Sequence, residues 1–175
     1  MRTRNPSPAP LSPSQLPLVL DNSVVSNLHR AGVLERVLTL WVGRWLVPLQ
    51  VKDEAAAWPG EGQRVVRGLE DLRERRILDF VVLDPRAEGA LYARLTRTLG
   101  QGEAASITIA YHRQYGVALD DYPARRACDR LVLPLPSIMT EGLLHCAVVE
   151  GFLALDEARA IWVTMGIADP KRQVL

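Results

Sequence analysis

The sequence has little of several features that would narrow its function at once. Its two cysteines, Cys128 and Cys146, lie far apart without CxxC spacing, which argues against a zinc site or a disulfide framework and favours buried thiols in a reducing compartment. The three histidines show no metal-ligand spacing either. The formal net charge is only +1, so any contact with nucleic acid must come from a local patch.

Long apolar runs are also missing. No stretch reaches the roughly 18 apolar residues that a membrane-spanning helix needs. Residues 1–17 are rich in proline and serine, and the apolar stretch Leu18–Leu20 is too short for the core of a signal peptide before Asp21 ends it. We therefore expect a disordered extension over 1–17, a single domain over 18–175 and a cytoplasmic protein.

Several common catalytic signatures are absent from the sequence. It contains no GxSxG, no Walker glycine loop with Lys-Ser/Thr, no HExxH and no GxGxxG after the first predicted strand. These absences argue against a serine-hydrolase elbow, a P-loop, a zinc-protease helix and a dinucleotide-binding turn. Any chemistry must come from other residues.

What the sequence does have is a regular alternation of short apolar segments with helical segments. Strands are expected at Leu16–Leu20, Trp45–Leu49, Leu78–Leu83, Val117–Leu119 and Leu131–Leu135. Helices are expected over 22–31, 33–41, 51–58, 63–76, 85–99, 103–115, 122–130, 137–150 and 155–165, with a turn at 100–102. This alternation predicts an α/β fold, a parallel sheet with helices on both faces.

Acidic residues follow two of the predicted strands. Asp21 ends the first strand, and Asp120 and Asp121 end the fourth. In a parallel sheet, ligands bind at the carboxyl ends of the strands. Aspartate is also a favoured helix N-cap, which would be enough to explain Asp21 and Asp121. Capping leaves Asp120 unexplained, because neighbouring carboxylates repel each other unless a cation lies between them.

Two glutamates occupy apolar sides of predicted helices. Helical spacing places Glu54 on one face with Val51 and Ala55, so its carboxylate points toward the sheet. Glu103 opens a helix and shares a side with Ile107. A carboxylate directed at the core is costly unless it is paired or binds a metal. The alternatives are that Glu54 reaches water at the edge of its stripe and that Glu103 interacts with the helix dipole.

Together these acids suggest a metal site. We expect the carboxyl groups of Asp21, Glu54, Glu103 and Asp121 to gather at one end of the sheet, close enough to share one or two cations. Carboxylates without histidine or cysteine are hard oxygen ligands, which suit Mg²⁺ or Mn²⁺. Two such ions about 3.5–4 Å apart stabilise the attacking and leaving oxygens in phosphodiester hydrolysis.

Four segments resemble PIN-domain proteins, the nuclease family that includes the VapC-like toxins of bacterial toxin–antitoxin pairs. They are LVLDNSVVSNL, VPLQVKDEA, LGQGEAASITIA and GVALDDYPARRAC, and they span about residues 18–130. A weaker resemblance continues from Leu131 to the end. Within this resemblance the last acid corresponds to Asp121, while Asp120 joins it on the metal or tunes it. Tyr122 stands where relatives often carry a basic residue.

The resemblance implies a Mg²⁺- or Mn²⁺-dependent endoribonuclease that forms a homodimer and, if it is a toxin, is held inactive by a small antitoxin. Asp21, Glu54, Glu103 and Asp121 would be its catalytic acids, and these four with Asp120 its metal ligands. Candidate contacts to RNA phosphates are the arginines of 67–76 with Arg94, Arg97, Arg125 and Arg126.

Three alternatives stay open. Each of these arginines can instead belong to a solvated helix face with ion pairs. The protein can also be a non-catalytic PIN-fold module that binds RNA or protein. A response-regulator-like switch also carries paired acids at strand ends, but here the pair Asp120–Asp121 comes late in the chain, and no suitable lysine follows it.

Overall fold

Five parallel strands form one sheet in the order β3-β2-β1-β4-β5. The structure is a computed structural model, and it describes residues 13, 14, 16–131 and 135–165. The strands are β1 (Leu18–Leu20), β2 (Trp45–Pro48), β3 (Leu78–Val81), β4 (Gly116–Ala118) and β5 (Ser137–Ile138). The predicted parallel sheet is confirmed, and β1 lies at its centre.

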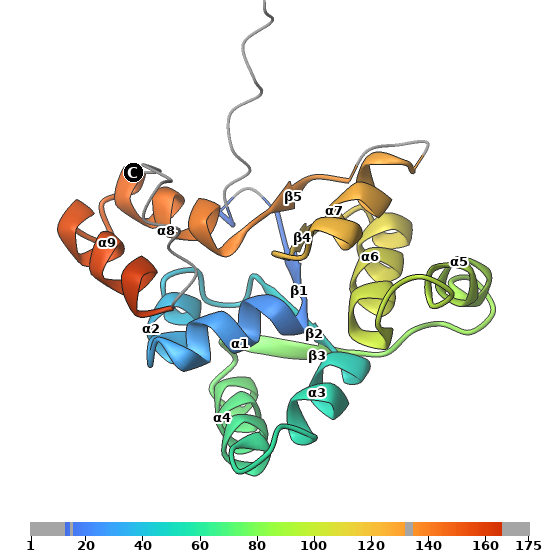
Figure 1. Ribbon diagram of the computed structural model, residues 1–175, viewed down its shortest axis with the longest axis horizontal. Coiled ribbons are helices and arrows are strands. Elements are labelled where there is room, and N and C mark those ends of the chain that lie inside the picture. Colours follow the sequence, from blue (N-terminus) through green and yellow to red (C-terminus); the bar gives the residue numbers. More distant parts are fainter. Residues whose placement is uncertain (1–12, 15, 132–134, 166–175) are drawn as a thin grey trace, which may run out of the picture.

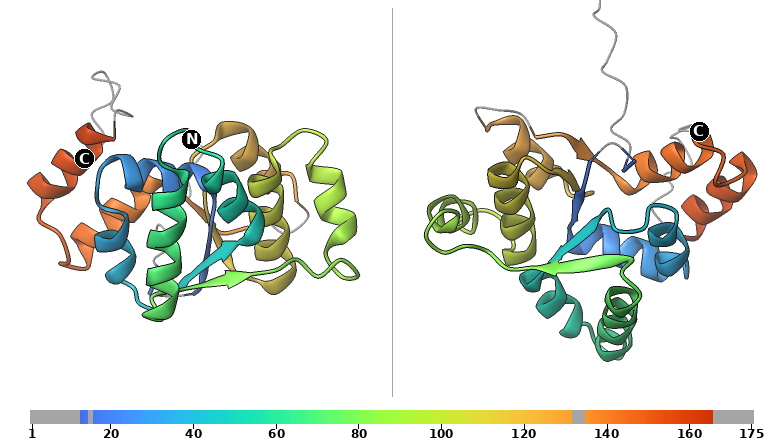
Figure 2. Two further views of the ribbon diagram at one scale, coloured as in Figure 1. Left: turned by 90° about the horizontal axis from the view of Figure 1, so that it is seen from below. Right: turned by 180° about the vertical axis from the view of Figure 1, so that it is seen from behind.

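The described helices are α1 (Asn22–Arg30), α2 (Leu34–Thr39), α3 (Leu49–Ala56), α4 (Gly62–Glu74), α5 (Gly89–Leu95), α6 (Gln101–Arg113), α7 (Tyr122–Asp129), α8 (Thr140–Val149) and α9 (Leu155–Thr164). Figure 1 shows α1, α2, α8 and α9 on one side of the sheet and α5, α6 and α7 on the other. Figure 2 shows the same two layers from below and from behind. Helices thus cover both faces, as predicted for an α/β fold.

Two hydrophobic cores follow from the alternation of side chains along the strands. Leu18 and Leu20 pack into one core with residues of α1, α2, α4, α8 and α9. Val19 points the other way and packs with α6 and α7. Both cysteines are buried, as expected. In the described part of the chain, no helix is long and apolar enough to cross a membrane.

One predicted helix is much shorter than expected. Instead of 85–99, α5 covers only Gly89–Leu95. The preceding loop is held by Glu88, which is buried and pairs with Arg113 through two hydrogen bonds of 2.7 and 3.0 Å. Burial opposes ionisation of Glu88, but the hydrogen bonds from Arg113 and from the Asp84 amide lower its pKa. This ion pair to a distant helix overrides the local preference for a helix starting at Pro85.

A second boundary difference bears on the site. The predicted turn at 100–102 is wrong, because α6 begins at Gln101 and Gly100 is its N-cap. The Gly100 amide donates to Glu103 Oε2 over 3.0 Å, a capping contact that fixes the start of the helix at Gln101, two residues before the predicted start. Gly102 therefore lies inside the first turn of α6, where its amide donates a hydrogen bond to Glu54 of α3.

Two predicted segments extend beyond the described residues. The extension expected over 1–17 lies largely outside them. Its last residue, Pro17, accepts a hydrogen bond from the Gly116 amide over 3.0 Å, so pairing along the β1–β4 ladder begins at this proline. The fifth strand expected at Leu131–Leu135 also includes residues outside the described part. The strand that pairs with β4 is β5, further along the chain.

Candidate active site

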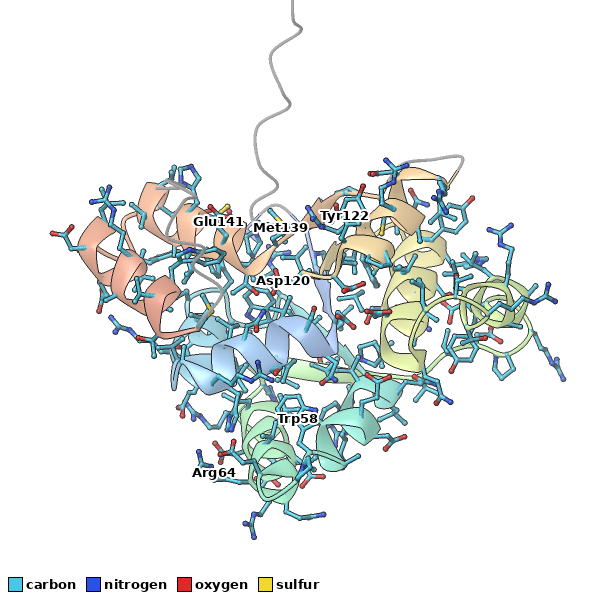
Figure 3. All side chains as sticks on the ribbon, viewed as in Figure 1. Trp58, Arg64, Asp120, Tyr122, Met139 and Glu141 are labelled. Carbon is cyan, nitrogen blue, oxygen red and sulfur yellow. The ribbon has the colours of Figure 1, made fainter. Side chains whose placement is uncertain are left out.

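The predicted site acids lie on elements that meet at the carboxyl edge of the sheet. Asp21 follows β1, and Asp120 and Asp121 follow β4, its neighbour in the sheet. Glu54 lies in α3, directly after β2 on the other side of β1, and Glu103 lies in the first turn of α6. Figure 3 shows Asp120 where β4, α1 and the start of α8 approach one another.

Asp21 is fully buried and uses its two carboxylate oxygens differently. Oδ2 accepts hydrogen bonds from the Ser23 amide (3.1 Å) and the Ser23 hydroxyl (2.6 Å), which makes Asp21 the N-cap of α1. Oδ1 is buried and has no hydrogen-bond partner in the described structure. Burial raises the pKa of Asp21, the bonds from Ser23 and Asn22 lower it, and the charge of Glu54 raises it again. The capping interpretation is therefore correct, and it leaves one buried oxygen available.

The start of α6 holds both glutamates. Glu54 Oε1 accepts from the Gly102 amide over 2.7 Å, and Glu103 Oε2 accepts from the Gly100 amide. Both side chains are half-buried, and Glu54 shares its face with the buried Val51, as the helical spacing predicts. The positive end of the helix dipole favours both negative charges.

Glu103 is electrostatically linked to the other acids. Burial raises its pKa most, the hydrogen bond from Gly100 lowers it, and the charges of Asp21, Asp121 and Glu54 raise it further. The structure thus brings Asp21, Glu54 and Asp121 within range of the charge of Glu103, and Asp21 within range of the charge of Glu54. These four residues are called the carboxylate cluster below.

The two neighbouring aspartates have different surroundings. Asp120 accepts from Asn27 Nδ2 (2.6 Å), the Thr140 amide (2.7 Å) and the Thr140 hydroxyl (2.5 Å). Its own amide donates to Ser23 Oγ. Asp121 occupies the N-cap position of α7, but its side chain makes no capping hydrogen bond. Asp120 therefore connects β4 to α1 and α8, whereas the charge of Asp121 acts on Glu103.

Sequence reasoning missed the residues that hold Asp120. Asn27 lies one helical turn after Ser23, so α1 presents both side chains on one face. Thr140 opens α8, where threonine is a common residue at a helix start. These local signals mark Asn27 and Thr140 as helix-end or surface polar residues. They do not reveal that both reach the same aspartate.

The carboxylates do not form a ready coordination sphere. Within the described ranges, no three His, Cys, Asp or Glu side chains are grouped so that they could hold a metal ion. The reason lies in the hydrogen bonds: Glu54 and Glu103 bind main-chain amides, and Asp21 Oδ2 binds Ser23. The chemistry of the residues nevertheless fits Mg²⁺ or Mn²⁺. All the donors are hard carboxylate oxygens, and Asp21 Oδ1 is buried without a partner.

The candidate phosphate-binding arginines fall into two groups. Arg75, in the segment 67–76, pairs with Glu35 and Asp71, so this residue belongs to an ion-paired helix face. The other group makes no ion pair within the described part of the chain and consists of Arg67, Arg73, Arg76, Arg94, Arg97, Arg125 and Arg126. Arg125 and Arg126 lie on α7, directly after Asp121.

The raised pKa of Glu103 predicts a pH dependence of stability in the absence of divalent cations. A carboxyl group with a higher pKa in the folded protein binds its proton more tightly there, so its contribution to stability is lost as pH rises. For Glu103 this loss begins near the ordinary value of 4.5 and is complete above the raised pKa. We expect Glu103→Gln, which lacks this penalty, to gain stability relative to the parent as pH rises through that window.

Urea unfolding in EDTA from about pH 4 to about pH 8 measures this difference. Glu88, whose pKa is lowered, contributes the opposite slope in both proteins and cancels in the comparison. Glu74→Gln, on the exposed surface of α4, is the matched control. Parallel stability curves for the parent and Glu103→Gln would contradict the electrostatic coupling of the carboxylate cluster.

The chain matches a model of a known protein family. A family model described as a PIN domain matches residues 17–166, which include every strand and helix described above. None of the curated proteins compared with the chain matches it. All members of the carboxylate cluster lie inside the matched range.

Proposed function

Because the chain belongs to the PIN-domain family, we propose that it is a metal-dependent endoribonuclease that hydrolyses RNA phosphodiester bonds. The family's fold is typical of nucleases. The observation that carries the proposal is the carboxylate cluster: Glu103 interacts with the charges of three other acids at the carboxyl edge of a parallel sheet. Such an accumulation of negative charge is costly unless a cation neutralises it.

In this proposal Asp21, Glu54, Glu103 and Asp121 hold Mg²⁺ or Mn²⁺. A divalent ion there supplies Lewis-acid catalysis, which activates water and neutralises charge on the scissile phosphate. Asp21 offers its buried Oδ1 while Ser23 orients the carboxylate through Oδ2. The amides of Gly100 and Gly102 hold the two glutamates at the edge of the sheet.

Asp120 has a positioning role in the same proposal. Its three hydrogen bonds keep the end of β4 against α1 and α8, and this fixes where Asp121 begins α7. The same bonds occupy both of its oxygens, so Asp120 is a weaker candidate for a metal ligand than Asp121. It supports the cluster through the backbone.

A substitution at Gly102 tests the proposal without changing any acidic residue. A Cβ at Gly102 would lie 2.5 Å from Glu54 Oε2, so Gly102→Ala must displace that carboxylate. The displaced atom is the far end of a flexible side chain, so the fold should remain. A Cβ at Gly100 would lie 3.6 Å from Glu54 Oε1, an ordinary contact. We expect Gly102→Ala to slow RNA cleavage about 100-fold and Gly100→Ala to cleave nearly like the parent.

The assay is cleavage of a labelled single-stranded RNA with Mn²⁺, Mg²⁺ or EDTA, with circular dichroism to check the fold of each variant. Equal rates for Gly102→Ala and the parent would remove Glu54 from the proposed site. If the parent leaves RNA intact with both metals, the nuclease proposal fails. The alternative, a non-catalytic PIN-fold module that binds RNA or protein, would then take its place.

The resemblance of the four acidic segments to VapC-like toxins supports a more specific form of this proposal. The protein would be the toxin of a toxin–antitoxin pair, a homodimer that acts on RNA in the cytoplasm and is inhibited by a small antitoxin. A small reading frame next to this one, whose product blocks RNA cleavage, is the observation that would support this form.

A further inference from the structure

A groove of about 400 Å³ lies beside α7, immediately after Asp121 in the chain. Tyr122, Arg126 and Arg130 line it from α7 and its C-cap, and Thr98 lines it from the segment before α6. The spacing of the three α7 residues, four apart, places them along one face of the helix. The groove therefore begins at the residue that adjoins the carboxylate cluster.

Tyr122 has an exposed ring with a cation next to it. Its exposed fraction is 62 %, which is high for a large aromatic residue. The Arg125 guanidinium carbon lies 5.7 Å from the centre of the ring. Figure 3 shows Tyr122 in the same region as Asp120, where β4 ends and α7 begins. An exposed aromatic face beside arginine is the surface on which an unpaired nucleic-acid base stacks.

The positive charges of the groove are not compensated within the described chain. Arg126 and Arg130 are exposed and make no ion pair there. Asp129, the acid on the same helix, is not within ion-pair distance of either arginine. Helical rise separates successive members of the row by about 6 Å along the axis. The groove thus combines an aromatic platform with two arginines in a line that make no ion pair with any described residue.

We propose that this groove binds single-stranded RNA next to the scissile phosphate, with a base stacked on Tyr122 and backbone phosphates on Arg126 and Arg130. This inference rests on the proposed ribonuclease function and adds a residue that positions the substrate. Stacking needs an unpaired base, so the groove selects single-stranded over double-stranded RNA. Its position after Asp121 places the bound nucleotide beside the carboxylate cluster.

The test measures binding separately from cleavage. Fluorescence anisotropy in EDTA compares a labelled single-stranded RNA with an oligonucleotide of the same length that lacks bases. We expect Tyr122→Ala to bind the RNA about tenfold more weakly than the parent does. The variant and the parent should bind the strand without bases equally well. Tyr122→Phe, which keeps the ring, should bind both like the parent. Arg126→Ala should weaken the binding of both strands. It should also lower the salt dependence of the binding constant by the amount expected for about one phosphate contact.

Arg44→Ala is the matched control, because Arg44 is exposed and directly precedes β2, at the end of the sheet opposite the carboxylate cluster. RNA binding by Tyr122→Ala equal to that of the parent would overturn the proposal. If Tyr122→Ala lost affinity equally for the RNA and for the abasic strand, that result would also overturn the proposal. It would point to a general anion site, such as one for an acidic protein segment. If these binding results hold but Mn²⁺ supports no cleavage, the groove stands and the nuclease function fails.

Discussion

Asp21→Asn is expected to slow RNA cleavage by about 1,000-fold or more while leaving the protein folded. Asp21 is the fully buried member of the carboxylate cluster, and its Oδ1 is buried without a hydrogen-bond partner among the described residues. The substitution removes a negative charge from the place where a cation would be held. Asparagine caps helices as well as aspartate does, so the hydrogen bonds from Ser23 in α1 to the side chain of residue 21 should survive.

The stability of the same variant separates a catalytic effect from a folding defect. Burial and the charge of Glu54 raise the pKa of Asp21, which means that the ionised form destabilises the folded protein. We expect Asp21→Asn to melt in EDTA at the temperature of the parent or above it. Asp53→Asn is the control, because Asp53 is exposed on α3 next to Glu54. Parent-like cleavage by Asp21→Asn, or equal inactivity of Asp53→Asn, would contradict the assignment.

Substitutions of the two neighbouring aspartates should have different effects, one mainly on RNA cleavage and the other mainly on stability. Asp121→Asn is expected to abolish cleavage with little change in stability, because its side chain makes no capping hydrogen bond and its charge acts on Glu103. Asp120→Asn is expected to lose about 1–3 kcal/mol of stability. In the parent, three donors share the two carboxylate oxygens of Asp120, whereas asparagine offers them a single acceptor oxygen. The folded Asp120→Asn protein should still cleave RNA, more slowly than the parent.

Urea unfolding and RNA cleavage of both variants, at a temperature where each is folded, measure the two effects. Thr140→Val removes one of the donors to Asp120 without touching an acid, so it should reproduce part of the stability loss. If Asp120→Asn is inactive but stable and Asp121→Asn is active, the two aspartates exchange roles. Asp120 would then be the metal ligand.

Local patterns were enough to predict the architecture. The strand Leu18–Leu20 and the helix after it are visible because a short apolar run ends at an aspartate that caps the helix. The stripe of Val51, Glu54 and Ala55 likewise predicts that Glu54 shares the buried face of α3. Each of these signals involves residues a few positions apart, whose relation is set by helix or strand periodicity.

Long-range pairing accounts for what the sequence could not predict. Glu54 bonds to Gly102 and Asp120 bonds to Thr140, and neither contact has a local signature. The pairing of Glu88 with Arg113 shortens α5 for the same reason. The sequence predicts a closely grouped carboxylate cluster, but Asp21, Glu54 and Glu103 bind nearby amides and a hydroxyl instead. Without a cation, like charges are more stable on such donors than beside one another.

The proposed cation site is tested most directly by titrating the metal-free protein with Mn²⁺ and following the free ion by electron paramagnetic resonance. Removal of one ligand should weaken binding at a site built from carboxylates, since each supplies charge and a donor atom. We predict that the parent removes Mn²⁺ from solution and that Asp21→Asn loses this binding, while Asp53→Asn keeps it. Identical titration curves for the parent and Asp21→Asn would contradict a metal site at the carboxylate cluster.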